Sequence, residues 1–213
     1  MIRVWLEAVT TLPLMPDTDA YLSHAESARA RNMRGAQQRR SYTAIHQWMH
    51  ARVAEAIGVP ADRLPLGIDR CGAPALHGFA HSLGLSHHED RVALAVSDGE
   101  PVGIDVLTVP TDVGFVVDTG LVLSAAEIML VRSAAPERRG PLFATCWTRK
   151  EAYAKLLRTG LTPGLERLTL TPSAEGAAGA RIWTARLGDA VVSVATDVSV
   201  PLDVAVADRK SVV

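Results

Sequence analysis

Cysteine is scarce in this sequence. The 213 residues include two cysteines, Cys71 and Cys146, which lie far apart along the chain. Two isolated cysteines provide neither a disulfide framework nor a closely spaced metal-binding set. We therefore expect both thiols to be reduced.

Long apolar runs are absent as well. No stretch approaches the roughly 18 apolar residues that a membrane span requires. Near the start of the chain, Arg3 and Glu7 interrupt the unbroken apolar segment that a signal peptide needs. The sequence therefore predicts a cytoplasmic protein without a membrane partner.

The sequence also lacks an excess of charge of either sign. There are 22 Lys and Arg residues and 23 Asp and Glu residues, which leaves a net charge of −1. This balance argues against a nucleic-acid partner, because such proteins carry a basic field. Hydrophobic residues make up 48% of the chain, which excludes a disordered or acidic-tail protein. The length suits one large domain or two small ones.

One local charge asymmetry is present. Between Ser23 and Arg52 there is one acidic residue, Glu26, and there are six arginines: Arg29, Arg31, Arg34, Arg39, Arg40 and Arg52. Such a run is typical of a solvated helix face, and it also suits the binding of a phosphate or an acidic partner. The sequence leaves both interpretations open.

Periodicity and capping signals predict a mixture of helices and strands. In the first part of the chain we expect a strand over 1–8, a helix from Ser23 to Gly58, a loop over 67–88 and a strand over 91–97. A tight turn over 98–101 then leads into a buried strand over 102–107.

The second part repeats this order. A capping box of Ser124 and Glu127 opens one helix, and a longer helix spans residues 141–160. We expect an antiparallel meander after it, with strands over 165–170, 181–187, 190–196 and 202–207. The sequence thus predicts an α+β fold of two similar halves, residues 1–103 and 104–213, which meet near Gly103.

A single carboxylate, Asp105, interrupts an otherwise apolar strand. Burial of a carboxylate is costly unless it is paired or holds a cation. Glu151 and Lys155 are four residues apart on a predicted helix and therefore share one face. If Asp105 and Glu151 converge, they offer the oxygen ligands that Mg²⁺ prefers, and Lys155 offers a charge for a phosphate. This set suits phosphoryl-type transfer, whereas a Glu and Lys pair alone is common as a surface ion pair.

These residues form part of a longer pattern. Gly103-Ile104-Asp105 is followed by Trp147-x-x-Lys150-Glu151-Ala152-x-x-x-Lys155, and the upstream segments Gly72-Ala73-Pro74 and Ser86-His87 fall in matching order. The arrangement resembles the signature of Sfp-type 4'-phosphopantetheinyl transferases, over roughly residues 23–170. The paired motif is fairly specific because both parts and their separation match.

The resemblance implies a pseudo-twofold pair of α+β halves with coenzyme A in the cleft between them. It implies a Mg²⁺-dependent enzyme of the holo-[acyl-carrier-protein] synthase type. Such an enzyme moves the 4'-phosphopantetheine group from coenzyme A to a serine of an apo acyl or peptidyl carrier protein and releases 3',5'-ADP. We expect a monomer, since internal symmetry supplies in one chain what a related dimer achieves with two.

By the same resemblance, Asp105, Glu151 and Lys155 are the expected catalytic residues. Asp105 and Glu151 would be the Mg²⁺ ligands, and Glu151 would also be the base for the carrier serine, directly or through a water. Lys155 would bind the pyrophosphate of coenzyme A and stabilise charge on the leaving side.

The resemblance also implies contacts to the nucleotide part of coenzyme A. Ser86 and His87 would hold phosphates, and the turn from Gly72 to Pro74 would border the adenine. An arginine is expected at the 3'-phosphate. Arg40 is the nearest candidate, Arg39 is an alternative, and an ungapped count places Ser41 at that position.

The sequence departs from the family pattern in two further places. Leu107 occupies the position, two residues after Asp105, where many members carry a third acidic ligand. Ala73 replaces the usual lysine of the Gly72–Pro74 segment, which removes one cation. Glu127 lies where members carry an acidic residue near the site, but its place in a capping box is sufficient to explain it.

Two other functions fit parts of the sequence. One is a different Mg²⁺-dependent phosphodiester enzyme, such as a nuclease, although a Glu-x-x-x-Lys helix in a protein without net basic charge is not typical of nucleases. The other is a non-catalytic protein that binds coenzyme A or an acidic partner, a hypothesis to which Leu107 and Ala73 give some weight.

Overall fold

The computed structural model of the protein describes residues 1–16, 21–114, 117, 122–160, 164–177, 179–197, 199 and 204–206. The first part of the chain forms β1 (Ile2–Ala8), α1 (His24–Asn32), α2 (Ala36–Ile57), β2 (Leu66–Ile68), β3 (Pro74–Leu76), β4 (Ser82–His88) and β5 (Arg91–Ser97). The second part forms β6 (Val102–Thr108), α4 (Ala125–Ser133), α5 (Pro136–Leu156), β7 (Gly176–Ala177), β8 (Ala180–Leu187), β9 (Ala190–Asp197) and β10 (Val204–Val206). The predicted α+β class is therefore confirmed.

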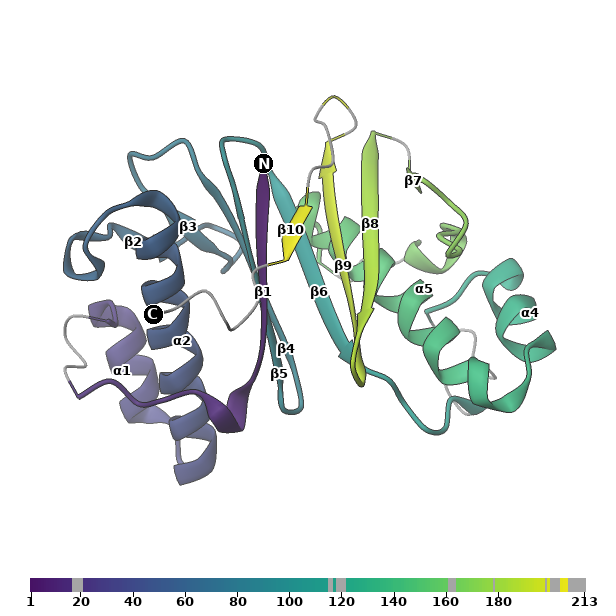
Figure 1. Ribbon diagram of the computed structural model, residues 1–213, viewed down its shortest axis with the longest axis horizontal. Helices are drawn as coiled ribbons and strands as arrows, with labels where there is room; N and C mark the ends of the chain where they lie inside the picture. Colours follow the sequence, from purple (N-terminus) through teal and green to yellow (C-terminus); the bar gives the residue numbers. More distant parts are fainter. Residues whose placement is uncertain are drawn as a thin grey trace.

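Two four-stranded sheets form the centre of the molecule (Figure 1). The strand order is β10-β1-β5-β4 in the first sheet and β6-β9-β8-β7 in the second. β10 pairs with β1 in parallel, and the other neighbouring strands pair antiparallel. β2 and β3 form a separate two-stranded hairpin.

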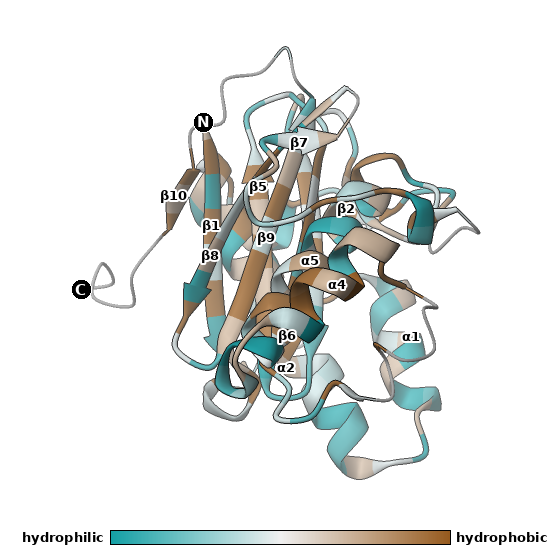
Figure 2. Ribbon diagram, turned by 90° about the vertical axis from the view of Figure 1, so that its right-hand side faces the viewer, coloured by the Kyte–Doolittle hydropathy of each residue, from teal (hydrophilic) through white to brown (hydrophobic). Residues whose placement is uncertain are grey.

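The two sheets pack face to face, and a long helix covers the outer face of each. On β5, Val92, Leu94 and Val96 pack in a hydrophobic cluster with α2, whereas Ala93 and Ala95 pack against the second sheet. This alternation follows the period of two in a strand, and it explains why β5 is apolar at nearly every position. Figure 2 shows that β9 is likewise hydrophobic along most of its length, and all but its last residue are buried.

Several predicted elements are confirmed. β1, β5, β6, β8 and β9 coincide with predicted strands to within one or two residues, and Gly58 ends α2 in a left-handed conformation. The capping box of Ser124 and Glu127 opens α4 as predicted. These elements carry strong local signals, because their hydrophobic period or their caps are written in consecutive residues.

Other predicted boundaries are wrong. The helix predicted from Ser23 to Gly58 breaks at residues 33–35 into α1 and α2, with Gly35 as the N-cap of α2. The segment predicted as a loop over 67–88 instead forms most of β2 and all of β3 and β4. β2 pairs with β3, and β4 pairs with β5, and the local sequence pattern does not reveal this pairing. The long helix begins at Pro136 rather than at Pro141, and Pro141 lies inside its first turns.

The predicted meander is also partly wrong. Residues 165–167 form a short 3-10 helix in place of the start of a strand. β10 does not join the second sheet but pairs with β1 in the first, and the rest of the strand predicted over 202–207 lies outside the described residues. The predicted boundary at Gly103 falls inside β6, and the division into two symmetric halves stays a prediction. Within the described ranges, no helix is both long and apolar enough to cross a membrane.

Candidate functional site

Asp105, Ser86 and Lys155 form a hydrogen-bonded triangle where β6, β4 and α5 meet. Lys155 Nζ donates to Asp105 Oδ1 at 2.6 Å and to Ser86 Oγ at 2.8 Å. Ser86 Oγ in turn donates to Asp105 Oδ1 at 2.7 Å. The structure thus brings together a strand carboxylate and a helix lysine that are 50 residues apart in sequence.

Gly103 explains how α5 comes so close to β6. A Cβ atom on Gly103 would lie 2.0 Å from the carbonyl oxygen of Ala152 and 2.5 Å from the amide nitrogen of Leu156. Only glycine therefore fits at this position, because the obstructing atoms belong to the backbone of α5. Asp105 lies two residues further along β6 and faces the same side, toward Lys155.

Glu151 lies beside this triangle and lacks a partner for one of its oxygens. Its Oε1 is buried and has no hydrogen-bond partner among the residues that the structure describes. Burial and the negative charge of Asp105 raise the pKa of Glu151, and Lys155 partly opposes this effect. Two carboxylates that repel each other in a partly buried place are suited to holding a cation between them.

The remaining residues of the helix motif have structural roles. Lys150 Nζ lies 2.6 Å from Glu127 Oε2 and donates to the carbonyl oxygens of Val122 and Leu165 at 2.9 and 3.0 Å. Glu127 also accepts hydrogen bonds from the backbone N–H groups of Ser124 and Leu170. Glu127 is thus fully occupied in anchoring α4 and α5.

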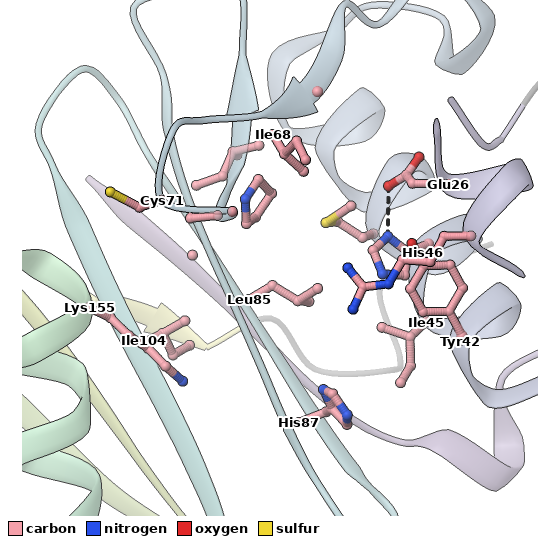
Figure 3. Close-up of a pocket in the computed structure, with 18 of the residues that line it drawn as sticks. Glu26, Tyr42, Ile45, His46, Ile68, Cys71, Leu85, His87, Ile104 and Lys155 are labelled. Atoms are coloured by element: carbon pink, nitrogen blue, oxygen red, sulfur yellow. Dashed lines mark hydrogen bonds and ion pairs between the residues drawn. The ribbon is translucent and has the colours of Figure 1, made fainter. Parts of the chain in front are cut away.

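A cavity of about 780 Å³ adjoins the triangle. It lies between α2 and the C-terminal end of α5, and Figure 3 shows Lys155 and His46 on opposite sides of it. Of the residues assigned from the sequence to coenzyme A, Gly72, Pro74, His87 and Lys155 line this cavity. Its size is that of a typical site for a small molecule or cofactor.

Ser86 and His87 point in different directions because successive residues of a strand face opposite sides. His87 lines the cavity, while the hydroxyl of Ser86 is engaged with Asp105 and Lys155. Burial and the positive charge of Lys155 lower the pKa of His87 from its ordinary value, with smaller effects from His46 and His88. His87 therefore takes up a proton less readily than an ordinary histidine does.

The structure describes all six arginines of this region. Arg40 is exposed on α2 and is not one of the described residues that line the cavity. Ser41 and Arg29 do line it. Neighbouring positions of a helix point about 100° apart, so Arg40 and Ser41 face different directions. The assignment of Arg40 to a coenzyme A contact stays a prediction, and Arg29 is the arginine of this region at the cavity.

Sequence reasoning missed a buried polar cluster on the wall formed by α1 and α2. Glu26 accepts hydrogen bonds from His46 Nδ1 at 2.6 Å, from His50 Nε2 at 2.9 Å and from Ser23. Burial alone would raise the pKa of Glu26, but the hydrogen bonds from His46 and His50 hold it well below its ordinary value. The capping-box spacing of Ser23 and Glu26 and the i,i+4 spacing of the two histidines were signals for this cluster.

The cluster fixes two further side chains at the cavity. The rings of Tyr42 and His46 are 4.0 Å apart, and the guanidinium carbon of Arg29 lies 5.6 Å from the centre of the Tyr42 ring. Arg29, Tyr42 and His46 all line the cavity. This wall therefore presents cationic and hydrogen-bonding groups opposite Lys155.

The described residues contain no cluster of three or more His, Cys, Asp or Glu side chains arranged to hold a metal ion. Leu107, at the position of the additional acid, is buried in a hydrophobic cluster with Phe143 and Cys146. Two carboxylates remain, Asp105 and Glu151, and the unpartnered oxygen of Glu151 fits a cation. Such a pair suits Mg²⁺, which keeps several waters and binds phosphate oxygens as its other ligands.

Comparison with known proteins finds a family match for the second part of the chain. A model of the 4'-phosphopantetheinyl transferase superfamily matches residues 101–203, which include β6, α5 and the triangle residues Asp105 and Lys155. This part of the chain is therefore similar to that superfamily. The resemblance found in the motifs is therefore confirmed.

Two relatives are similar over part of their length. An L-aminoadipate-semialdehyde dehydrogenase-phosphopantetheinyl transferase of Eremothecium gossypii is 36% identical over 108 residues, which cover 48% of this chain and 39% of the relative. A 4'-phosphopantetheinyl transferase of Bacillus pumilus is 30% identical over 132 residues, which cover 61% of this chain and 55% of the relative. The matches thus span about half the length of these curated relatives or less.

Proposed function

We propose that this protein is a 4'-phosphopantetheinyl transferase of the holo-[acyl-carrier-protein] synthase type. It transfers the 4'-phosphopantetheine group of coenzyme A to a serine of an apo acyl or peptidyl carrier protein and releases 3',5'-ADP. One observation carries the proposal: Asp105 and Lys155 meet beside a cavity large enough for a cofactor, next to Glu151 with its unpartnered Oε1.

Asp105 and Glu151 would hold Mg²⁺ in this enzyme. When bound, the ion would neutralise charge on the pyrophosphate and orient it for attack at phosphorus. Burial and the charge of Asp105 raise the pKa of Glu151, which supports this role because a bound cation would offset both effects. Leu107 adds no ligand, so water and phosphate oxygens would complete the coordination.

Glu151 is the base that the geometry favours for the carrier serine. The Glu151 carboxylate would accept the serine proton, directly or through a water, while the serine oxygen forms a bond to phosphorus. The bond between this phosphorus and the bridging oxygen of the 3',5'-ADP part breaks. That oxygen leaves with 3',5'-ADP and gains the negative charge that develops as the bond breaks. Lys155, held by Asp105 and Ser86, is placed to stabilise this charge.

The opposite wall of the cavity supplies groups for the nucleotide phosphates. Arg29 and His46 line the cavity on this wall, His87 lines it from β4, and all three carry N–H donors. Glu26 orients His46 through Nδ1, which leaves Nε2 of that ring for the cavity. These groups offset the cation that is missing at Ala73, since an anion near several donors gains from each of them.

Mass spectrometry tests the proposal directly. The purified protein is incubated with Mg²⁺, coenzyme A and a panel of apo carrier proteins from fatty-acid and secondary-metabolite systems. We expect one carrier or more to gain one phosphopantetheine mass, and chelation of Mg²⁺ to abolish the gain. Absence of a gain with every carrier, together with tight binding of coenzyme A, would favour the non-catalytic binding protein instead.

A further inference from the structure

We propose that Arg158 and Asp69 form a clamp that closes the β2–β3 hairpin over the bound ligand. The identity of that ligand as coenzyme A depends on the function proposed above. The clamp itself is a property of the ligand-free chain and can be tested without it.

The clamp joins two walls of the cavity that come from distant parts of the chain. Arg158 Nη1 donates to Asp69 Oδ2 at 2.5 Å, and the two residues are 89 positions apart. Asp69 belongs to the connection between β2 and β3, and Arg158 follows the end of α5. Residues of both segments line the cavity: Gly67, Cys71 and Pro74 from the hairpin, and Lys155 and Arg158 from α5 and its end.

Asp69 also determines the shape of the hairpin connection. Its Oδ1 accepts hydrogen bonds from the backbone N–H groups of Cys71 at 2.8 Å and Ala73 at 2.9 Å. The N–H of Asp69 donates to the carbonyl of Ala73 at 2.8 Å, which closes the same turn. One carboxylate therefore holds the turn together with Oδ1 and attaches it to α5 with Oδ2.

The backbone at Arg158 supports a role for its side chain. Arg158 has a φ of +58°, a conformation that favours glycine. An arginine is unfavourable there on backbone grounds alone, and such residues concentrate at functional positions. The ion pair with Asp69 is the interaction that its side chain makes across the cavity wall.

The position of Arg158 connects the clamp to the catalytic helix. Arg158 lies three residues after Lys155, and its N–H donates to the carbonyl of Lys155 at 3.3 Å. In Figure 3, Cys71 of the hairpin and Lys155 of α5 lie on the same side of the cavity. A ligand that reaches Lys155 therefore lies next to the clamped turn, and release of the turn would widen that side of the cavity.

Hydrogen exchange in the ligand-free protein tests the clamp. We expect Arg158→Met to raise the exchange rates of residues 66–76 by about two- to fivefold, the range of a partly exposed ion pair. Exchange in β6 and α5 should not change. Arg167→Met is the matched control, because Arg167 is an arginine whose side chain is 87% exposed and pairs with the adjacent Glu166. Unchanged exchange in the hairpin, or an equal rise throughout the protein, overturns the clamp.

Arg158→Gly separates the clamp from global stability. This change removes the same side chain but suits the positive φ, so its melting temperature should be at or above that of Arg158→Met. Hairpin exchange should still rise as it does in Arg158→Met. A hairpin that is as protected in Arg158→Gly as in the unchanged protein overturns the clamp.

Transfer kinetics test the role of the clamp toward the ligand. We expect Arg158→Met to raise the KM for coenzyme A by about two- to fivefold, with a smaller change in kcat, and Arg158→Lys to restore part of the loss. A fall in kcat at constant KM overturns the clamp as a ligand-retaining device. Absence of coenzyme A binding by the unchanged protein overturns the proposed function, whereas the exchange result decides the clamp independently.

Discussion

Helix α5 contributes lysines to two lysine–carboxylate ion pairs that have the same N–O distance but differ in burial and in their surroundings. Lys150 and Glu127 are 2.6 Å apart with side-chain exposures of 2% and 0%, and Lys155 and Asp105 are 2.6 Å apart with exposures of 34% and 8%. The hydrogen bonds of the first pair are completed by backbone groups of α4 and of the segment around Leu165. The second pair adjoins a cavity and a carboxylate with an unpartnered oxygen.

The contrast teaches that environment decides what such a pair does. A buried pair with all its hydrogen bonds made has no capacity left for a ligand, and removal of one partner leaves a buried charge. A pair at a cavity edge can exchange its partner for a ligand at little cost. Lys150 therefore serves the fold and Lys155 serves the site, although both belong to one sequence motif.

The largest effect is expected at Glu151. On the proposed function, Glu151→Gln lowers kcat/KM for transfer by about 10²- to 10⁴-fold, because it removes a base and a metal ligand. The melting temperature should not fall, because the change also removes repulsion from Asp105. Kinetics and thermal melts measure the two effects, and Asp105→Asn should likewise abolish transfer in a folded protein. A Glu151→Gln variant that retains transfer within tenfold contradicts the assignment.

Disruption of the buried pair of Lys150 and Glu127 should lower the free energy of unfolding. Lys150→Met leaves Glu127 as an unpaired buried charge and should cost about 3–5 kcal/mol in the free energy of unfolding. Lys155→Met is the matched comparison and should cost less, because Lys155 is one-third exposed and Asp105 keeps its hydrogen bond from Ser86. Urea denaturation measures both. Equal losses for the two variants would remove the contrast between the pairs.

Gly103 should be sensitive because it sets the distance between β6 and α5. Gly103→Ala places a Cβ against the backbone of α5 and should cost about 1–3 kcal/mol, with a fall in transfer as Asp105 and Lys155 move apart. Gly35→Ala is the control, because its nearest neighbour would lie at an ordinary 3.5 Å. If both variants are equally stable in urea, α5 does not depend on this contact.

The smallest effect concerns the pH dependence of stability. The pKa of Glu26 lies well below its ordinary value of 4.5 in the folded protein, so the stability it contributes is present above that value and is lost as the pH falls. The urea midpoint should therefore decrease between pH 5 and pH 3 more steeply in the unchanged protein than in Glu26→Gln. Parallel curves would show that Glu26 is not held ionised by His46 and His50.

Elements that depend on residues close together in the sequence were predicted correctly, whereas elements that depend on distant partners were not. Residues 91–97 and 190–196 were recognised as strands because both faces of β5 and β9 are buried and their residues are apolar throughout. The loop predicted over 67–88 was wrong because short strands with Gly, Pro and His depend on their pairing partners. β10 was expected in the wrong sheet, since no local pattern specifies that it pairs with β1.

The same division applies to the site. Asp105 was recognisable because a carboxylate is unusual in an apolar strand, and Glu151 and Lys155 because their spacing places them on one helix face. The cluster of Glu26, His46 and His50 was missed, although its spacings were visible in the sequence. These side chains come into hydrogen-bond distance only when α1 packs on α2.

The sequence by itself determined the α+β class, the principal strands, the caps and the motif pair that resembles one enzyme family. These features depend on residues close together in the chain or on residue types at fixed spacing. The tertiary structure alone decided that Lys150 is bound to Glu127 while Lys155 faces a cavity, that Arg29 rather than Arg40 lines that cavity, and that Asp69 meets Arg158 across it. Burial and partners separate these residues, and both arise only when distant segments pack together.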